Sequence, residues 1–128
     1  MARLLRYGAY GYTLFIAVIC LIPLPHIQEA PEHSDKMVHV VTYVIFTLLW
    51  FAFFYFLRPN SDYFKVSLIK SCSFAIIYGI VIEALQAALT RSRSADFNDF
   101  LANLAGISGA LLVILVFRNQ FSKLKSKF

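Results

Sequence analysis

Long apolar stretches with almost no charged residues alternate with short polar segments along the chain. A helix needs roughly 20 apolar residues to cross the hydrocarbon core of a bilayer, and these stretches have about that length. The segment VVTYVIFTLLWFAFFYFL (residues 40–57) lacks the polar stripe that a helix of a soluble bundle presents to water. The pattern therefore predicts an all-α, four-helix transmembrane bundle, with helices near residues 5–23, 36–57, 65–89 and 97–117.

The composition agrees with one membrane domain that covers residues 1–128. Hydrophobic residues make up 59% of the chain and charged residues 15%, whereas a soluble domain is nearer half apolar and a quarter charged. We interpret the first helix as a membrane anchor and not as a signal peptide, because the segment PLPHIQEAPEH that follows lacks a small-x-small cleavage site. We expect Cys20 and Cys72 to lie at different depths, too far apart for a disulfide.

The basic residues are distributed unequally between the two sides of the predicted bundle. The side with both termini and the turn at 58–65 carries nine of them: Arg3, Arg6, Arg58, Lys65, Lys70, Arg118, Lys123, Lys125 and Lys127. The other side carries three: Lys36, Arg91 and Arg93. The positive-inside rule then predicts that both termini are cytoplasmic. Nucleic acid is not an expected partner, because no folded domain or aromatic platform accompanies the basic tail.

The second predicted helix carries three polar residues on one face. Asp35, His39 and Tyr43 follow at intervals of four residues, so they descend along that face from the start of the helix. Asp35 falls in the first turn, where a carboxylate suits the helix dipole. Lys36 can lean over the same face or extend to the membrane surface. Capping and anchoring explain Asp35 and Lys36, but they do not explain His39.

The third predicted helix carries Glu83 and Gln86 near its outer end. At 1.5 Å per residue, Glu83 lies about 9 Å below that end. A carboxylate at this depth costs about 2.5 kcal/mol or more unless it is paired or neutral, so we expect it to face the bundle or a wet cavity. The structural alternative is a hydrogen-bonded clamp between helices.

The fourth predicted helix begins with acidic residues and continues with small ones. Asp96 is a candidate N-cap, and Asp99, Asn103 and Gly106 follow on one face at intervals of four and three. A small-xxx-small ridge, which lets membrane helices approach closely, is formed by Ala102, Gly106 and Ala110. Neither capping nor close packing explains Asn103, about two turns inside the helix.

All these polar side chains map to the outer third of the membrane, although they come from three helices. We therefore expect them to form one polar pocket that is open to the outside. Its expected members are Asp35, His39, Tyr43, Glu83, Gln86, Arg93, Asp99 and Asn103.

The order and spacing of these residues resemble the VanZ-like family over roughly residues 20–112. That family carries Asp-Lys-x-x-His-x-x-x-Tyr at the start of one membrane helix and Glu-x-x-Gln near the end of the next. An Arg follows, then Asp, Asn and Gly at intervals of six, four and three. The matching residues are Asp35, Lys36, His39, Tyr43, Glu83, Gln86, Arg93, Asp99, Asn103 and Gly106, with Asp96 at a frequent acidic position. Because this chain reads LTRSRS where the family often has a Pro-Gly turn, either Arg91 or Arg93 can take the role of the family arginine.

The resemblance implies a small, multi-pass protein of the bacterial inner membrane. The namesake of the family is associated with resistance to the glycopeptide teicoplanin. The resemblance therefore implies an envelope setting and an architecture, and it leaves the chemistry open.

The first functional hypothesis is a binding module with an accessory role in envelope biology or glycopeptide resistance. The pocket would hold a membrane lipid headgroup or a lipid-linked envelope precursor, with arginine and the start of helix four on its phosphate. The candidate binding residues are Asp35, Lys36, Tyr43, Gln86, Arg93, Asp96, Asp99 and Asn103. In particular, we expect Arg93 to be held by Asp99 or Glu83 and aimed at an anionic group.

Two alternatives remain. The protein could be an enzyme acting on a lipid-linked or polysaccharide precursor, with Glu83 as acid or base and His39 as proton carrier. It could also be an accessory subunit whose polar network only locks the bundle, with a membrane-protein partner or as a homo-oligomer. Asp35, His39 and Asp99, with His33 on a loop, are too few ligands to predict a metal site, and no cofactor is expected.

Overall fold

The computed structural model describes residues 1–22, 34–59, 63–90 and 96–128. Its helices are α1 (Ala2–Leu21), α2 (Ser34–Phe56), α3 (Phe64–Leu89), α4 (Phe97–Val116) and α5 (Arg118–Ser126). The first four are long and apolar enough to cross a membrane. Their ends lie within three residues of the bounds predicted from the sequence. The predicted four-helix transmembrane bundle is therefore confirmed.

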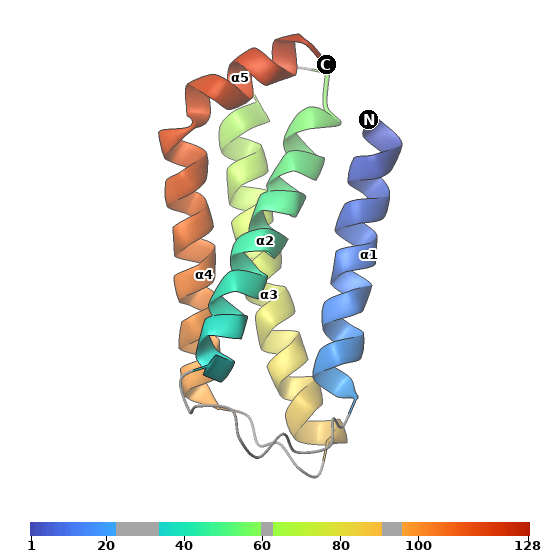
Figure 1. Cartoon of the computed structure of the whole chain (residues 1–128), viewed down its shortest axis with the longest axis vertical. Coiled ribbons are helices and arrows are strands. Elements are labelled where there is room, and N and C mark those ends of the chain that lie inside the picture. The colour runs from blue at the N-terminus through green and yellow to red at the C-terminus, as the bar shows by residue number, and fades with distance from the viewer. Residues whose placement is uncertain (23–33, 60–62, 91–95) are drawn as a thin grey trace.

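The four long helices run alternately up and down, and both termini lie at the same end of the bundle (Figure 1). The end of α3 and the starts of α2 and α4 consequently meet at the opposite end. This arrangement brings together the helix segments on which the sequence placed its polar residues.

Aromatic rings fill the middle of the bundle between α2 and α3. The rings of Phe46 and Tyr78 stack with centroids 4.8 Å apart, and Trp50 meets Phe74 edge to face at 4.5 Å. Such pairs contribute about 0.5–1.5 kcal/mol beyond the area they bury. This layer separates the polar end of the bundle from the end with the termini.

Helix α1 is the least buried of the long helices, and polar bonds attach it to its neighbours. The indole nitrogen of Trp50 donates to Thr13 Oγ1 at 3.1 Å, and the Tyr78 hydroxyl donates to the Thr13 carbonyl at 2.6 Å. Only Ala9 and Ile16 of this helix are buried. Its other side chains leave a broad apolar face for lipid.

The small-residue ridge of α4 makes a close helix contact, as predicted, and the structure shows that its partner is α2. Ala102, Gly106 and Ala110 are all buried. A methyl group added to Gly106 would overlap the carbonyl oxygen of Val40 and would lie 3.0 Å from Tyr43 Cβ. Glycine at this position therefore sets how closely α2 and α4 approach.

Helix α5 was not predicted, because its sequence RNQFSKLKS is short and basic and was considered only for its charge. It lies across the end of the bundle that holds the termini (Figure 1). Phe121 packs edge to face on Phe51 at 5.3 Å, and the Lys125 ammonium lies 4.1 Å from the centre of the Tyr55 ring. Partial burial lowers the pKa of Lys125 from its usual value.

Candidate functional site

A hydrogen bond between His39 and Asn103 joins α2 to α4 at the polar end of the bundle. His39 Nδ1 lies 3.0 Å from Asn103 Oδ1, and both residues are buried. Because an amide oxygen only accepts, the ring donates through Nδ1–H in this arrangement. Asn103 thereby fixes the imidazole so that its other nitrogen, Nε2, is free of this contact.

The Nε2 atom of His39 faces the carboxylate of Asp99. It lies 3.8 Å from Asp99 Oδ2, which is longer than a hydrogen bond. Asp35 offers a third group, and one ligand atom from each of Asp35, His39 and Asp99 lies within 4.8 Å of the others. Asp35 is exposed at the start of α2, so this triad opens toward the aqueous surface.

Glu83 on α3 lies behind this triad. Its residue exposure is only 7%, and its Oε1 atom has no hydrogen-bond partner among the described residues. Asp99 and His39 are close enough to interact electrostatically with its carboxyl group. The prediction that Glu83 faces the bundle is confirmed, and its unpartnered oxygen carries a desolvation cost of about 1–3 kcal/mol.

Tyr43 and Gly79 form the floor of this region. The Tyr43 hydroxyl is buried and has no hydrogen-bond partner among the described residues. A methyl group on Gly79 would lie 3.2 Å from that hydroxyl and 3.4 Å from Asn103 Nδ2. Gly79 was not predicted from the sequence, although its spacing of four residues before Glu83 places both on one helical face and could have indicated it. We call Asp35, His39, Tyr43, Glu83, Asp99 and Asn103 the polar cluster.

Gln86 has a structural partner beside the polar cluster. Its Nε2 atom donates to the Cys20 carbonyl at 3.0 Å, which ties the end of α3 to the end of α1. Gln86 was predicted as a candidate binding residue, and this contact was not foreseen. Neither Cys20 nor Cys72 forms a disulfide, as expected.

The remaining predicted binding residues are distributed around the polar cluster. Asp96 is exposed and caps α4, its carboxylate accepting from the Asn98 amide at 2.9 Å, so the predicted N-cap is confirmed. Lys36 is half-buried in the first turn of α2. Arg91 and Arg93 lie outside the described residues, and so does His33.

The polar cluster combines groups that can exchange protons with groups that can hold a cation. His39 and Glu83 are titratable, buried and near each other. Asp35, His39 and Asp99 are the described residues that could together hold a metal ion. From the sequence, these residues were judged too few to predict a metal site, whereas the structure places them around a common space.

The comparisons with known proteins agree with this architecture. The family described as VanZ/LLP1 matches residues 8–118, which include the four long helices almost entirely and every residue of the polar cluster. No curated protein and no solved structure matches the chain. Since the match spans most of its length, the chain belongs to the VanZ/LLP1 family.

Proposed function

We propose that this protein binds the headgroup of a membrane lipid or a lipid-linked cell-envelope precursor in the polar cluster, in an accessory role in envelope biology. The observation that carries the proposal is the buried carboxyl group of Glu83, whose Oε1 has no partner among the described residues. Ionisable residues within membrane helices rarely lack a function.

A purely structural network is the weaker explanation of the polar cluster. Such a network would satisfy its own hydrogen-bonding groups, because a partly satisfied buried network destabilises a fold. His39 and Asn103 satisfy each other, but the Tyr43 hydroxyl and Glu83 Oε1 remain unpartnered among the described residues. These two oxygens favour an external donor, such as a headgroup hydroxyl or amine.

The proposal includes an orientation in the inner membrane, with both termini in the cytoplasm and the polar cluster toward the outer leaflet. Nine basic residues against three support it. Single cysteines at Glu29, Ser92 or Ser122, in a variant without Cys20 and Cys72, test it in intact cells. An impermeant thiol reagent should label the first two and spare the third, and the reverse pattern would overturn the orientation.

Binding can be measured directly by native mass spectrometry of the detergent-solubilised protein. The lipids offered are polyprenyl phosphate, phosphatidylglycerol and phosphatidylethanolamine. We expect one of them to bind preferentially and Glu83→Gln to weaken that binding at least tenfold. Asp62→Asn, which makes the same change in net charge at a position between α2 and α3 in the sequence, should bind as the wild type does. Equal binding by both variants would contradict the proposal.

A membrane-embedded enzyme that acts on the same precursors is the second candidate. It is favoured by the fixed orientation of His39, whose Nδ1 contacts Asn103 while Nε2 faces Asp99. Orientation of an imidazole by neighbouring groups is a feature of acid–base sites. A change in the mass of an added precursor, present with wild type and absent with Glu83→Gln, would favour the enzyme over the binding module.

A further inference from the structure

We propose that Asp35, His39 and Asp99, with Glu83 behind them, bind a divalent cation of the Zn²⁺ class. Binding of the cation to these residues can be tested in the absence of lipid. Its consequence for lipid binding, that the cation bridges the protein to a phosphate, rests on the proposed function.

The ligand types fit this class of cation. An imidazole nitrogen with two carboxylate oxygens is a donor set typical of Zn²⁺ and less typical of Mg²⁺ or Ca²⁺, which prefer oxygen alone. Metal-bound histidines usually donate their other ring N–H to an acceptor that fixes the ring. The contact of His39 Nδ1 with Asn103 Oδ1 at 3.0 Å supplies that second interaction.

The distances fit as well. Ligand atoms that lie about 2.0–2.2 Å from a tetrahedral Zn²⁺ are roughly 3.3–3.6 Å from one another. His39 Nε2 and Asp99 Oδ2 are 3.8 Å apart, too far for a hydrogen bond and close to this spacing. Asp35, whose ligand atom is within 4.8 Å of the others, is exposed in the first turn and has room to adjust.

The environment of Glu83 independently indicates a cation at this site. Three carboxyl groups, those of Asp35, Asp99 and Glu83, gather around one imidazole, and the Glu83 oxygen Oε1 is buried without a partner among the described residues. A bound cation would compensate the buried carboxyl group of Glu83, for which desolvation is most costly. With three protein ligands, such a cation keeps a position open for an oxygen of phosphate.

The test is equilibrium binding of Zn²⁺ to the full chain in detergent, without lipid and with the affinity tag removed. Co²⁺ is used as the spectroscopic substitute. We expect one equivalent to bind, and Asp35→Asn and Asp99→Asn to weaken binding at least tenfold. Asp35 is exposed, so its variant keeps the proposal falsifiable even if the others fold poorly. Asp62→Asn, which lies in the sequence between α2 and α3 and makes the same change in charge, is the matched control.

Unchanged Zn²⁺ affinity in both Asp35→Asn and Asp99→Asn would overturn the site. So would a failure of the wild type to bind Zn²⁺, which would indicate that a cationic side chain of the protein supplies the compensating charge. The bridging role is tested separately with polyprenyl phosphate in EDTA and in Zn²⁺. Equal binding in both solutions would overturn bridging while the proposed function stands, whereas Zn²⁺ binding without any lipid binding would overturn the proposed function while the metal site stands.

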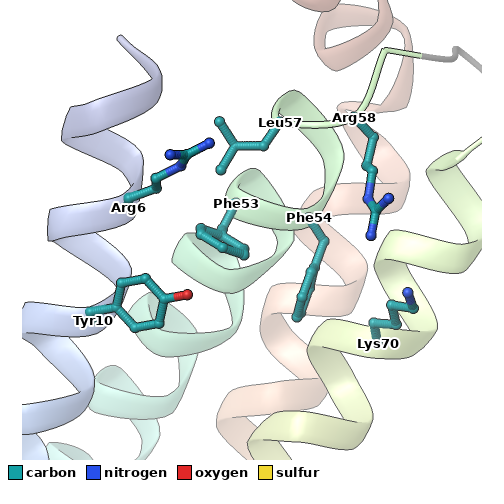
Figure 2. Close-up of a pocket in the computed structure, with 7 residues that line it drawn as sticks. All are labelled: Arg6, Tyr10, Phe53, Phe54, Leu57, Arg58 and Lys70. Atoms are coloured by element: carbon teal, nitrogen blue, oxygen red, sulfur yellow. The ribbon is translucent and has the colours of Figure 1, made fainter.

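A different feature, at the end of the bundle with the termini, carries a second inference. A hollow of about 500 Å³ lies among α1, α2 and α3 there. Figure 2 shows Arg58 and Lys70 turned toward each other and Arg6 reaching across from α1, above aromatic side chains. The lining residues are Arg6, Tyr10, Phe53, Phe54, Leu57, Arg58 and Lys70, and none is acidic. We call this hollow the basic pocket.

We infer that the basic pocket holds the phosphate of an anionic phospholipid, with the acyl chain along Phe53, Phe54 and Leu57. Like charges that converge on one space repel each other unless an anion lies between them. Arginine forks suit phosphate oxygens. Basic residues near an anionic leaflet are attracted by its negative surface potential. The apolar rings beneath the cations distinguish a lipid from a free phosphate ion.

The fluorescence of Trp50, the single tryptophan of the chain, can report on this pocket. The centre of its ring system lies 5.6 Å from the ring centre of Tyr10 and 5.0 Å from that of Phe53, and both residues line the pocket. We expect brominated phosphatidylglycerol to quench its fluorescence about twofold more than brominated phosphatidylcholine does. Arg58→Gln/Lys70→Gln should abolish this preference. The control Lys65→Gln/Lys127→Gln, which removes two cations outside the pocket, should retain it. Equal quenching by both lipids in the wild type, or displacement by millimolar inorganic phosphate, would overturn the inference.

Discussion

The two ends of the bundle carry opposite charges in different environments. At the polar cluster, the carboxyl group of Glu83 lies inside the protein and is only 7% exposed, while Asp35 lies at the exposed start of α2. At the basic pocket, Arg6, Arg58 and Lys70 are all exposed and extend over aromatic side chains. The described acidic residues lie at one end, and most of the basic residues lie at the other.

For function, the difference in burial between the charged residues at the two ends is more informative than the difference in the sign of their charge. An exposed arginine or lysine at a membrane surface costs little, because its stem packs on apolar groups while its charge stays in water. A buried carboxyl group costs free energy that the rest of the fold must offset. Basic residues that only set the orientation of the protein in the membrane can stay exposed. The polar cluster, which contains a buried carboxyl group, is therefore the better candidate for a selected chemical function.

The largest effect is expected where the polar cluster depends on the close approach of α2 and α4. Gly106→Leu would push a side chain into the Val40 backbone, and overpacking of this kind costs about 3 kcal/mol. Thermal melting in detergent and the yield of monodisperse protein measure it. Ala105→Leu, at the exposed neighbouring position, is the control. A wild-type melting temperature for Gly106→Leu would mean that these helices do not pack as described.

The next effect concerns the bond that fixes the imidazole. Asn103→Ala removes the acceptor of His39 Nδ1 and leaves a buried donor unpaired, so we expect a loss of about 2 kcal/mol in the free energy of unfolding. Denaturant or thermal unfolding in detergent measures this loss. Asn98→Ala removes an exposed amide from the same helix and should change stability by less than about 0.5 kcal/mol. Similar losses in both variants would argue against the buried bond.

A smaller effect of opposite sign is expected at Glu83. Without ligand, and with EDTA present, Glu83→Gln should raise stability by about 1 kcal/mol, because a neutral amide is less costly to bury than a carboxylate. Such a gain is typical of a functional group that the fold tolerates at a cost. A loss of stability in EDTA would instead favour the structural network.

The smallest effect is expected at the basic pocket. Arg58→Gln/Lys70→Gln should change the free energy of unfolding by less than about 0.5 kcal/mol, since both side chains are exposed. The melting temperature, compared with that of Lys65→Gln/Lys127→Gln, measures this. A loss above about 1 kcal/mol would remove the contrast between the two ends.

Periodicity and length made much of the fold predictable. Apolar runs predicted the four membrane helices, and the spacing of small residues predicted that Gly106 faces a neighbouring helix. The capping preference of acidic residues predicted the role of Asp96. These features depend on local sequence, so one helix at a time is enough to find them.

The contacts between helices could not be predicted from the sequence. The partners of His39 and Gln86 depend on how each helix is rotated about its axis and shifted along its neighbour, which no single helix determines. Helix α5 is stabilised by Phe121 packing on Phe51, a contact made only after the bundle has formed. The basic pocket likewise requires α1, α2 and α3 to be in place.

The central claim is that the polar cluster binds a ligand and lowers the stability of the ligand-free fold. The order in which the wild type and two variants melt tests this claim most directly. In EDTA, Glu83→Gln and Thr47→Val should both melt above the wild type, because Thr47 Oγ1, one helical turn beyond Tyr43 and not a member of the polar cluster, is also buried without a partner among the described residues. Addition of the lipid that the wild type prefers, with Zn²⁺ and at about 100 times the dissociation constant of that lipid, should stabilise the wild type by about 2.7 kcal/mol. The wild type should then overtake Glu83→Gln, while Thr47→Val keeps its lead. If the ligand shifts all three proteins equally, or shifts none, the account of the polar cluster as a binding site is contradicted.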